Sequence, residues 1–522
     1  MKVNLTLIQI LVLAAMLLAL PIAVQAQYTF TTNSDGSLNI SAYTGSGGAV
    51  VIPATTNGLT ITSIGGDSFQ GCTNLTSVTI PNTVTSIGAF AFDKCYSLSA
   101  IMVSASNLDY SSLGGALFNK SQTFLIQYPI GNAATNYSIP DSVTTIGDVA
   151  FDSCSRLANV TIPDSVTTIG EFSFQFCTNL TSVMIPNSVT SIGQGVFYIC
   201  SSLTSVTIST NLTSIGMYAF AGCASLTSVT IPNSVTSIGD FAFISCSSLT
   251  AITVSASNPD YSSLDGILFN QNQTTLIEYP AGLVGGYIIP NSVNNIADSA
   301  FIDCSNLTGV TIPNSVTTIE AYAFASCISL TNVTIPNSAT IIGEDAFQNC
   351  ANLTSVMIPD SITFIGQGLF YGCISLTSVT IPNSVTSIEE DALYGCSSLT
   401  NITFMGDAPA LVDTNEFLDD GVAAKTVYYY HGTSGWSSTY GGLPTVELFK
   451  PPQISGVGDN VGTPSGNFIF TVTGVSGQTI VVDASTNLVN WQPVWTNTLT
   501  GTNALFTDPQ WKNYPSRFYR AQ

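Results

Sequence analysis

The sequence predicts a mostly β fold, in which a solenoid of stacked coils is followed by a small C-terminal β-domain. Three observations lead to this prediction. Cysteine recurs at 23-residue steps, short segments of alternating polar and apolar residues recur in the same register, and both patterns end near residue 405. A fixed period of this length is typical of one supersecondary unit copied along an axis.

The cysteines define the register of the repeat. Nearly every step between them is 23 residues, and two longer steps of 59 and 58 residues mark insertions. Eleven of the twelve units have a Phe three residues before the Cys, and all twelve have a Leu three residues after it. The cysteines are Cys72, Cys95, Cys154, Cys177, Cys200, Cys223, Cys246, Cys304, Cys327, Cys350, Cys373 and Cys396.

Each unit contains one segment with the pattern of a half-buried strand. In 75–80, apolar Val78 and Ile80 alternate with hydroxyl residues, which is the period of two of a pleated strand. Pro81 has no N–H and ends the ladder. Stacked strands of this kind form a parallel sheet, with Phe, Cys and Leu behind it. The unit is too short for a full outer helix, so we expect turns, short 3-10 pieces or a small second strand there.

These residues resemble a known family. The pattern Cys-x-x-Leu-x-x-Val-x-Ile-Pro-x-Ser-Val-Thr-x-Ile-Gly-x-x-Ala-Phe, over roughly residues 55–405, is similar to the 23-residue leucine-rich repeat of BspA-like, treponemal-type surface proteins. The resemblance implies a leucine-rich-repeat solenoid in an exported bacterial protein that binds host molecules, matrix or other cells.

Changes in the pattern divide the chain into five expected parts. The ends of a solenoid need caps, because a terminal coil exposes a sheet edge and an apolar cross-section. In the C-terminal part, segments such as 468–473 and 479–482 have the pattern of strands, and Trp491, Trp495 and Trp511 are available for a small core. The expected parts are a signal peptide (1–26), an N-terminal cap (27–60), the repeats (61–405), a C-terminal cap (406–450) and the β-domain (453–522).

The first 26 residues have the composition of a secretory signal peptide. Lys2 precedes an apolar run from residue 5 to residue 20, and small residues lead to a cleavage site after Ala26. An uncleaved membrane anchor is the alternative, because the run is nearly long enough to span a bilayer. Cleavage predicts a secreted or cell-surface bacterial protein with no transmembrane segment in the mature chain.

The two insertions are copies of each other. Residues 100–107 match residues 251–258 at an offset of 151. We expect hairpin insertions near 104–139 and 255–289, with the second arm of each hairpin continuing the main sheet. Two interpretations stay open: the hairpins are projecting knobs that grip a ligand, or they are structural variants of the coil.

The charge balance excludes several partners. The chain has 9 basic and 31 acidic residues, a net charge of −22, and only 8% charged residues. Between residues 27 and 400 the cations are Lys94, Lys120 and Arg156. A nucleic-acid backbone requires clustered Lys and Arg, so we expect no nucleic-acid binding. Adhesion to an anionic membrane is disfavoured for the same reason.

The twelve cysteines could form disulfides or bind a metal, but their positions in the repeat argue against both. In an exported protein they would ordinarily suggest a disulfide framework. Parallel neighbours in a stack seldom offer the dihedral angle that a disulfide needs, however, and residues spread along a line do not converge on a metal. We therefore expect a structural ladder of twelve buried free thiols, with no metal site and no cofactor.

Catalysis finds little support in the sequence. His431 is the only histidine, so a Ser–His–Asp or Cys–His mechanism would have to use it, and it lies in the expected C-terminal cap. Acidic groups such as 344–345 and 389–391 fall in turns without EF-hand spacing, which leaves a calcium-binding edge as an alternative. We expect no catalytic residues and no enzyme activity.

The outward positions of the strands are the candidate binding surface. Seven residues after the Cys the chain mostly has Thr, interrupted by Met102, Met184 and Met357. Such a ribbon of hydroxyls suits an extracellular protein or glycan, although Thr also simply suits an exposed strand. The candidate ligand-binding residues are Thr79, Thr161, Thr207, Thr230, Thr253, Thr311, Thr334 and Thr380.

Three function classes follow from the sequence and the resemblance. The leading hypothesis is an exported, adhesion-like repeat protein that binds proteins or glycans at the cell surface through the solenoid face. The second is a structural envelope or spacer component that the C-terminal domain anchors. A secreted hydrolase comes last, because the single histidine and the scattered acidic residues give it little support.

Overall fold

The computed structural model describes residues 27–411, 425–449, 452–455, 468–514 and 516–522. These residues form two compact units, the first ending at Leu330 and the second beginning at Thr331. Both units consist of strands and turns, and the helical element of the described residues is one 3-10 turn, η1 (Trp511–Asn513). The expected signal peptide lies outside the described residues. Among those described, no helix is long and apolar enough to cross a membrane.

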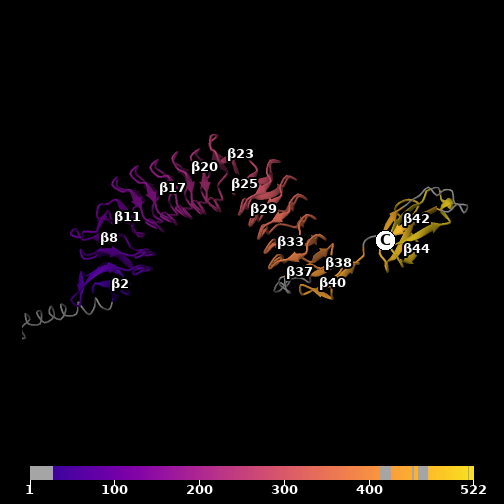
Figure 1. Cartoon of the computed structure of the whole chain (residues 1–522), viewed down its shortest axis with the longest axis horizontal. Helices are drawn as coiled ribbons and strands as arrows, with labels where there is room; N and C mark the ends of the chain where they lie inside the picture. Colours follow the sequence, from indigo (N-terminus) through magenta and orange to yellow (C-terminus); the bar gives the residue numbers. More distant parts are fainter. Residues whose placement is uncertain (1–26, 412–424, 450–451, 456–467, 515) are drawn as a thin grey trace, which may run out of the picture. The chain divides into compact units, whose positions relative to one another are not determined.

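The expected mostly β solenoid with a C-terminal β-domain is confirmed. Successive coils lie next to each other in chain order within each unit (Figure 1). One strand of each coil belongs to a parallel ladder, here called the main sheet; β16 (Ser182–Met184) and β18 (Ser205–Thr207), for example, pair residue by residue at a 23-residue step. Within β16, Val183 is buried while its two neighbours are exposed, which is the alternation that the sequence predicts.

The main-sheet strands of the first unit are β3 (Gly48–Val51), β6 (Leu75–Ile80), β8 (Ala100–Val103), β12 (Asn136–Ser138), β14 (Asn159–Thr161), β16, β18, β20 (Ser228–Ile231), β22 (Ala251–Val254), β26 (Gly285–Ile288) and β28 (Leu307–Thr311). Those of the second unit are β30 (Asn332–Thr334), β32 (Ser355–Met357), β34 (Ser378–Ile381), β36 (Asn401–Phe404), β38 (Thr426–Tyr430) and β40 (Leu443–Leu448), and β39 (Thr439–Tyr440) pairs antiparallel with β40.

A second ladder of two-residue strands runs through the array. Most of these strands bury an Ile, as β17 does with Ile192, and many pair in parallel with the same strand of the next coil, as β17 does with β19. In the first unit these strands are β7 (Ser86–Ile87), β13 (Thr145–Ile146), β15 (Thr168–Ile169), β17 (Ser191–Ile192), β19 (Ser214–Ile215), β21 (Ser237–Ile238), β27 (Asn295–Ile296) and β29 (Thr318–Ile319). In the second unit they are β31 (Ile341–Ile342), β33 (Phe364–Ile365), β35 (Ser387–Ile388) and β37 (Ala410–Leu411).

Tight turns connect the second ladder to the cysteine. Each turn takes the left-handed conformation five residues and one residue before the Cys, as at Tyr218 (φ 57°) and Gly222 (φ 71°) ahead of Cys223. The amide of Gly222 then donates to the carbonyl oxygen of Ile244 in the next coil (2.8 Å). A chain that reverses its φ angle twice within five residues cannot continue as a helix, so the outer side consists of turns and the small second strand.

Stacks of Phe rings from successive coils form the core of the repeats. Phe197 is fully buried, and its ring centroid lies 5.5 Å from that of Phe174 and 5.4 Å from that of Phe220, with interplanar angles of 16° and 11°. Offset stacking of this kind adds a favourable quadrupole interaction to the burial of apolar area. The stack, together with the buried Leu and Ile positions, fills the space between the main sheet and the turns.

The cysteines lie beside this stack as free thiols. Eleven are buried and Cys72, in the first coil, is partly buried. Where the preceding coil has a Phe, the thiol typically donates to the carbonyl oxygen of that Phe, as in the 3.1 Å contact from Cys200 Sγ to Phe174 O. Burial raises the pKa of the Cys223 thiol to about 12, so it stays protonated and acts as a donor at neutral pH. The buried thiols therefore behave as small apolar groups, most of which donate one weak hydrogen bond to the preceding coil.

The insertions form three-stranded antiparallel units. The first contains β9 (Tyr110–Leu113), β10 (Ala116–Asn119) and β11 (Phe124–Gln127), and the second contains β23 (Tyr261–Leu264), β24 (Ile267–Asn270) and β25 (Thr275–Glu278). The expected hairpins are present, but the second arm continues the second ladder and not the main sheet, because β11 pairs in parallel with β13 and β25 with β27. The main sheet resumes at β12 and β26.

The aromatic stack gives the reason for this correction. Tyr128 follows β11 and stacks on Phe151, with ring centroids 5.3 Å apart. Tyr279 stacks on Phe301 in the same way at 4.8 Å. In every coil the second-ladder strand precedes the aromatic position, so the strand before Tyr128 has to belong to that ladder. Each insertion is thus an additional coil that has a Tyr in place of Phe and no Cys.

The insertions differ at three titratable positions, and one of them, next to the stacked Tyr, has a strongly shifted pKa. Glu278 ends β25, and Gln127 holds the matching position in β11. Burial raises the pKa of Glu278 to about 8. Because the folded protein then holds this proton more tightly than the unfolded chain, the contribution of Glu278 to stability is complete below about pH 4.5 and is lost as the pH rises through about 8.

Glu278→Gln is therefore expected to raise the melting temperature at pH 8.5 and to leave it nearly unchanged at pH 4.5. Each pH unit between these limits weakens the folding of the wild type by at most about 1.4 kcal/mol through this group. Thermal unfolding followed by circular dichroism from pH 4.5 to 9 measures the difference. Gln127→Ala is the control, because Gln127 is the uncharged residue that matches Glu278 in the first insertion. It should lower the melting temperature by the same amount at every pH. A melting-temperature difference between Glu278→Gln and wild type that is the same at every pH would contradict this account.

The N-terminal residues extend the core of the first unit. β1 (Tyr28–Thr32) pairs antiparallel with β2 (Leu38–Tyr43), which pairs in parallel with β5 (Leu59–Ile64); β4 (Thr55–Thr56) forms a hairpin with β5. Tyr43 stacks on Phe69 with ring centroids 5.0 Å apart, so this segment supplies an aromatic ring ahead of the first Phe.

The C-terminal strands form two three-stranded antiparallel sheets. One has the order β41 (Gln453–Ser455), β42 (Phe468–Thr473), β45 (Asn503–Asp508), and the other β44 (Gln492–Thr498), β43 (Thr479–Ser485), β46 (Phe518–Ala521). Their shared core contains Phe470, Val482 and Phe506, with Trp495 packed at its edge. Outside this core, the Arg520 guanidinium lies 4.6 Å from the centroid of the Trp491 ring.

Candidate functional site

The candidate Thr residues lie on the outward face of the main sheet. This face is called the outward strip, meaning the position seven residues after each Cys and its in-register partners on neighbouring strands. Thr79 is half-buried. The other candidates are exposed, and they are Thr161, Thr207, Thr230, Thr253, Thr311, Thr334 and Thr380.

Exposed apolar side chains share the strip with these hydroxyls. In the first unit Met184 is 68% exposed and lies in register with Thr207, and Ile288 is 74% exposed and lies in register with Thr311. In the second unit Met357, 70% exposed, is in register with Thr334 and Thr380. A thioether side chain among short hydroxyls can adapt its shape to a partner surface.

Two apolar members of the strip escaped the sequence analysis. Val51, 71% exposed, pairs with Thr79, and Ile288 pairs with Thr311, but both strands belong to coils without a Cys ahead of them. The sequence does contain a signal: both residues directly precede the Ile-Pro pair that ends a main-sheet strand in the regular repeats.

A cavity in the first unit is the second candidate site, and it arises from a missing turn. The inserted coil runs from Tyr128 directly to Gly131, whose amide donates to the carbonyl oxygen of Leu98 (2.8 Å), and it has no Phe-x-x-Cys-x-x-Leu turn. The turns of the Cys95 and Cys154 coils are therefore neighbours across a gap. The gap forms a cavity of about 820 Å³, here called the first gap.

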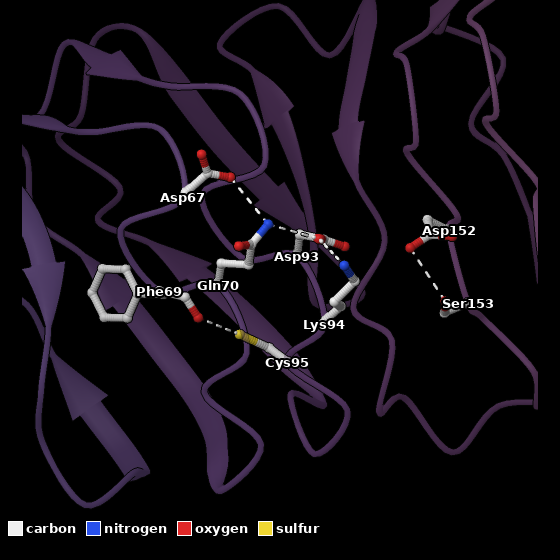
Figure 2. A network of polar contacts seen from close by, with 8 residues as sticks. All are labelled: Asp67, Phe69, Gln70, Asp93, Lys94, Cys95, Asp152 and Ser153. Atoms are coloured by element: carbon white, nitrogen blue, oxygen red, sulfur yellow. Dashed lines mark hydrogen bonds and ion pairs between the residues drawn. The ribbon is translucent and has the colours of Figure 1, made fainter.

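Two carboxylates, the buried Asp152 and the partly buried Asp93, form the floor of the first gap. The Asp93 carboxylate accepts a hydrogen bond from Gln70 Nε2 (3.1 Å) and lies 3.8 Å from Lys94 Nζ. Asp152, on the opposite turn, is 6% exposed and accepts a hydrogen bond from Ser153 Oγ (3.2 Å). Figure 2 shows these side chains, with Asp93 and Asp152 contributed by opposite sides of the gap.

Asp152 is held in an electrostatically unusual setting. Burial, together with the negative charge and hydrogen bonding of Asp93, raises the pKa of Asp152 to about 6, while Ser153 and Gln175 act in the opposite direction. Its Oδ1 is buried and receives no hydrogen bond among the described residues. A buried carboxylate oxygen without a donor is unfavourable by about 1–3 kcal/mol, which a ligand donor could recover.

Cations and aromatic rings surround the mouth of the first gap. The side chain of Lys94 is 59% exposed, and Arg156 is also exposed. The rings come from the turns of two coils: Phe90 (46% exposed) and Tyr96 (53%) belong to the Cys95 coil, and Phe176 (38%) belongs to the Cys177 coil. Two of the three cations between residues 27 and 400 thus line this one cavity.

The second insertion creates a matching gap with different residues. There the Ser245 hydroxyl donates to Asp303 Oδ2 (2.5 Å) and bridges the two turns. At the positions of Asp93, Lys94, Asp152 and Arg156, the second gap has Ile244, Ser245, Ile302 and Asn306. The two gaps share a backbone origin, but the four charged side chains belong to the first alone.

The remaining candidates have ordinary structural partners. His431 Nδ1 lies 2.7 Å from Glu447 Oε1, and the His431 ring stacks on Phe449 with centroids 4.9 Å apart. No group of three or more His, Cys, Asp or Glu side chains in the described part of the chain is arranged to hold a metal ion. The acidic turns at 344–345 and 389–391 belong to this described part.

Comparison with known proteins identifies the repeat. The profile of the BspA type leucine-rich repeat region, in six copies, matches residues 50–131, 131–250 and 287–414, which together span more than half of the chain. No curated protein matches the chain significantly.

Several solved structures are similar to this chain. A leucine-rich cell surface protein from Faecalibacterium prausnitzii is 33% identical, with 73% of this chain and 87% of that chain covered and a TM-score of 0.45. A leucine-rich repeat protein from Bacteroides ovatus is 25% identical, with 81% and 98% covered and a TM-score of 0.42. The pneumococcal vaccine antigen PcpA is 22% identical, with 78% and 92% covered and a TM-score of 0.46.

Proposed function

Because the chain belongs to the BspA-type leucine-rich repeat family, we propose that it is an exported surface protein that binds an extracellular macromolecule through the outward strip. One observation carries this proposal: large apolar side chains are exposed at regular positions on an otherwise hydroxyl-rich sheet face. Met184, Ile288 and Met357 are each more than two-thirds exposed there. Exposed apolar groups rimmed by polar residues are typical of protein contact surfaces.

The physical setting of the strip favours a protein partner. A parallel sheet holds its outward side chains about 4.8 Å apart from strand to strand. Hydrogen-bonded coils on both sides keep that spacing fixed, so little conformational freedom is lost when a partner binds. The strip offers many weak contacts and no deep pocket, which suits an extended macromolecular surface. The proposed role is binding without catalysis.

A pair of variants in the second unit tests the proposal. Residues 27–522 should bind at least one member of a panel of immobilised extracellular matrix proteins, measured by surface plasmon resonance. Met357→Glu places a charge in the middle of the strip and is expected to weaken that binding at least 10-fold, because the carboxylate would have to be desolvated at the interface.

Phe364→Glu is the matched control. Phe364 is also exposed (40%), in the same unit, but it lies on the second ladder, outside the strip. It should leave binding within about two-fold of wild type while giving the protein the same added charge. Equal losses in both variants, or no binding of the unmodified chain to any member of the panel, would overturn the proposal and favour the spacer hypothesis.

A further inference from the structure

The first gap combines features that packing alone does not require. Regular coils close their turns onto each other through backbone hydrogen bonds, as Ser153 does with Gln175 (2.9 Å). In the first gap, charged, amide and aromatic side chains converge on open space. From this arrangement we propose that the first gap binds a sugar unit of a glycan, at a site that is separate from the outward strip and does not depend on it.

The duplicated gap shows that these side chains are not needed to build the fold. The second gap has the same backbone origin, and a hydrogen bond between Ser245 and Asp303 bridges it. Ile244 and Ile302 stand there in place of the two floor carboxylates. The chain thus forms the gap with apolar residues at these positions, so the close pair of carboxylates in the first gap, one of them buried, requires an explanation other than folding.

The balance of charge narrows the class of ligand. Asp93 and Asp152 offset Lys94 and Arg156, so the cavity is close to neutral in a chain whose net charge is −22. A site for a basic peptide would be expected to carry excess negative charge, and a site for a polyanion would need a larger cluster of cations. A neutral cavity rich in donors and acceptors suits a ligand that is itself rich in hydroxyl groups.

The chemistry of the walls matches a pyranose ring. Sugar hydroxyls both donate and accept, and the gap offers carboxylate acceptors, the amides of Gln70 and Gln175, and hydroxyls such as that of Ser155. The buried Asp152 Oδ1 is an acceptor that lacks a donor. The exposed rings of Phe90 and Phe176 can stack against the C–H face of a sugar, because the negative face of an aromatic ring attracts polarised C–H groups.

The size of the gap is consistent with a short stretch of glycan. Its volume of about 820 Å³ lies within the roughly 300–1,000 Å³ that small-ligand sites usually have. The exposed Lys94 and Arg156 at the mouth can each donate to sugar oxygens or to the carboxylate of an acidic sugar. Neutral and acidic sugars share the ring chemistry, and the experiment separates them.

Isothermal titration of residues 27–522 tests the proposal. The probes are hexasaccharides of glucose, galactose, mannose and galacturonic acid, and hexalysine as the alternative ligand. At least one saccharide is expected to bind. If galacturonate binds more tightly than the neutral probes, the cations at the mouth contribute; if a neutral saccharide binds as well or better, the floor and rings are sufficient. Either result supports the site.

The variants take advantage of the duplicated gap. Asp93→Ile combined with Asp152→Ile installs the residues that the second gap already tolerates, and Phe176→Ala removes one ring. Each is expected to weaken saccharide binding at least 10-fold. Ser245→Ala combined with Asp303→Asn, at the second gap, should leave it unchanged. Thermal unfolding by circular dichroism confirms that all variants are folded.

Three results would overturn the proposal. The first is that no saccharide binds. The second is that binding persists in the Asp93→Ile and Asp152→Ile double variant. The third is that hexalysine binds while the saccharides do not, which would assign the gap to a basic peptide. Met357→Glu should leave saccharide binding intact, so failure of the strip proposal and failure of this one are distinguishable.

Discussion

Phe197→Ala is expected to lower the free energy of unfolding by about 3–5 kcal/mol. Phe197 is fully buried, and its ring stacks on both Phe174 and Phe220. Truncation removes the apolar contacts of the ring and interrupts the stack on both sides at once. The surrounding coils are tied together by backbone hydrogen bonds at every 23-residue step, so they can collapse only partly into the space that is left.

The chain itself provides the control for this prediction. Leu393 occupies the position of the Phe in the Cys396 coil and is 1% exposed, so the fold accommodates a branched aliphatic side chain there. Phe197→Leu is therefore expected to lose only about 1–2 kcal/mol. Urea unfolding followed by far-UV circular dichroism measures both variants. A loss of less than about 1 kcal/mol for Phe197→Ala would show that the aromatic stack is not the main source of stability.

The slope of the urea transition carries additional information. Repeat arrays behave as chains of coupled units, so a sufficiently weak coil can separate the array into segments that unfold independently. If Phe197→Ala breaks the coupling between its neighbours, the denaturant slope will fall and the transition will broaden, because each segment exposes less surface than the whole. An unchanged slope with a lower midpoint would mean that cooperativity survives the interruption.

The interior of the repeat was predictable because every copy repeats the same environment. A Phe, a Cys and a Leu at fixed spacing meet the same neighbours in each coil, and Phe220, Cys223 and Leu226 are accordingly fully buried. Strand ends were predictable as well, because Pro lacks the N–H that a ladder requires. Periodicity thus supplied information on tertiary contacts that a single unit would not contain.

The insertions and the first gap were harder to predict, for a physical reason. Tyr128 takes the place of a core Phe although no Cys follows it, so a register based on Cys does not include its coil. The cavity results from a turn that the inserted coil lacks. Sequence patterns indicate segments that are present, so they gave no indication of this missing turn. Asp93 and Asp152 are separated by a whole insertion in the chain, so only the three-dimensional stacking brings them to opposite sides of one gap.

The C-terminal domain shows a different limit of sequence reasoning. Its strands were predictable from alternation, but its tryptophans lie at the edge of the core and not at its centre. The centre is formed by smaller residues, such as Val472 and Ile480, which alternate within their strands. Trp491 instead lies beneath the Arg520 guanidinium, where its ring makes a cation–π contact outside the core.

Asn107→Ala is expected to destabilise the first insertion by about 3 kcal/mol or more. Asn107 is fully buried, and its amide Nδ2 donates to the carbonyl oxygens of Pro81 (2.8 Å) and Val84 (2.9 Å). Its Oδ1 accepts from the backbone amides of Asp109 (2.9 Å) and Tyr110 (2.8 Å). Alanine would leave these four backbone groups without their partner, and each unsatisfied buried group is unfavourable by about 1–3 kcal/mol where water cannot reach it.

The duplicated insertion indicates that this side chain is what joins the hairpin to the coil before it. Asn258 makes the same four hydrogen bonds, donating to Pro232 and Val235 and accepting from Asp260 and Tyr261, at 2.8–2.9 Å. Only an amide can donate twice and accept twice in this geometry. Asn107→Asp, which has the same shape but loses the donors, should therefore be no more stable than Asn107→Ala at neutral pH.

Hydrogen exchange of the β9 to β11 amides and the urea midpoint measure the effect of Asn107→Ala. Asn132→Ala is the control, because Asn132 is only half-buried. Its side chain makes two hydrogen bonds and not four, donating to Ser99 O (3.3 Å) and accepting from the Ala134 amide (2.9 Å), so the loss should be clearly smaller than that of Asn107→Ala. If Asn107→Ala is no worse than Asn132→Ala, the hairpin is held by its apolar contacts. If Asn107→Ala is worse, the hydrogen bonds of the Asn side chain hold the hairpin to the preceding coil. If the losses of unfolding free energy at Asn107 and Asn258 also add in the double variant, the two insertions are stabilised independently of each other.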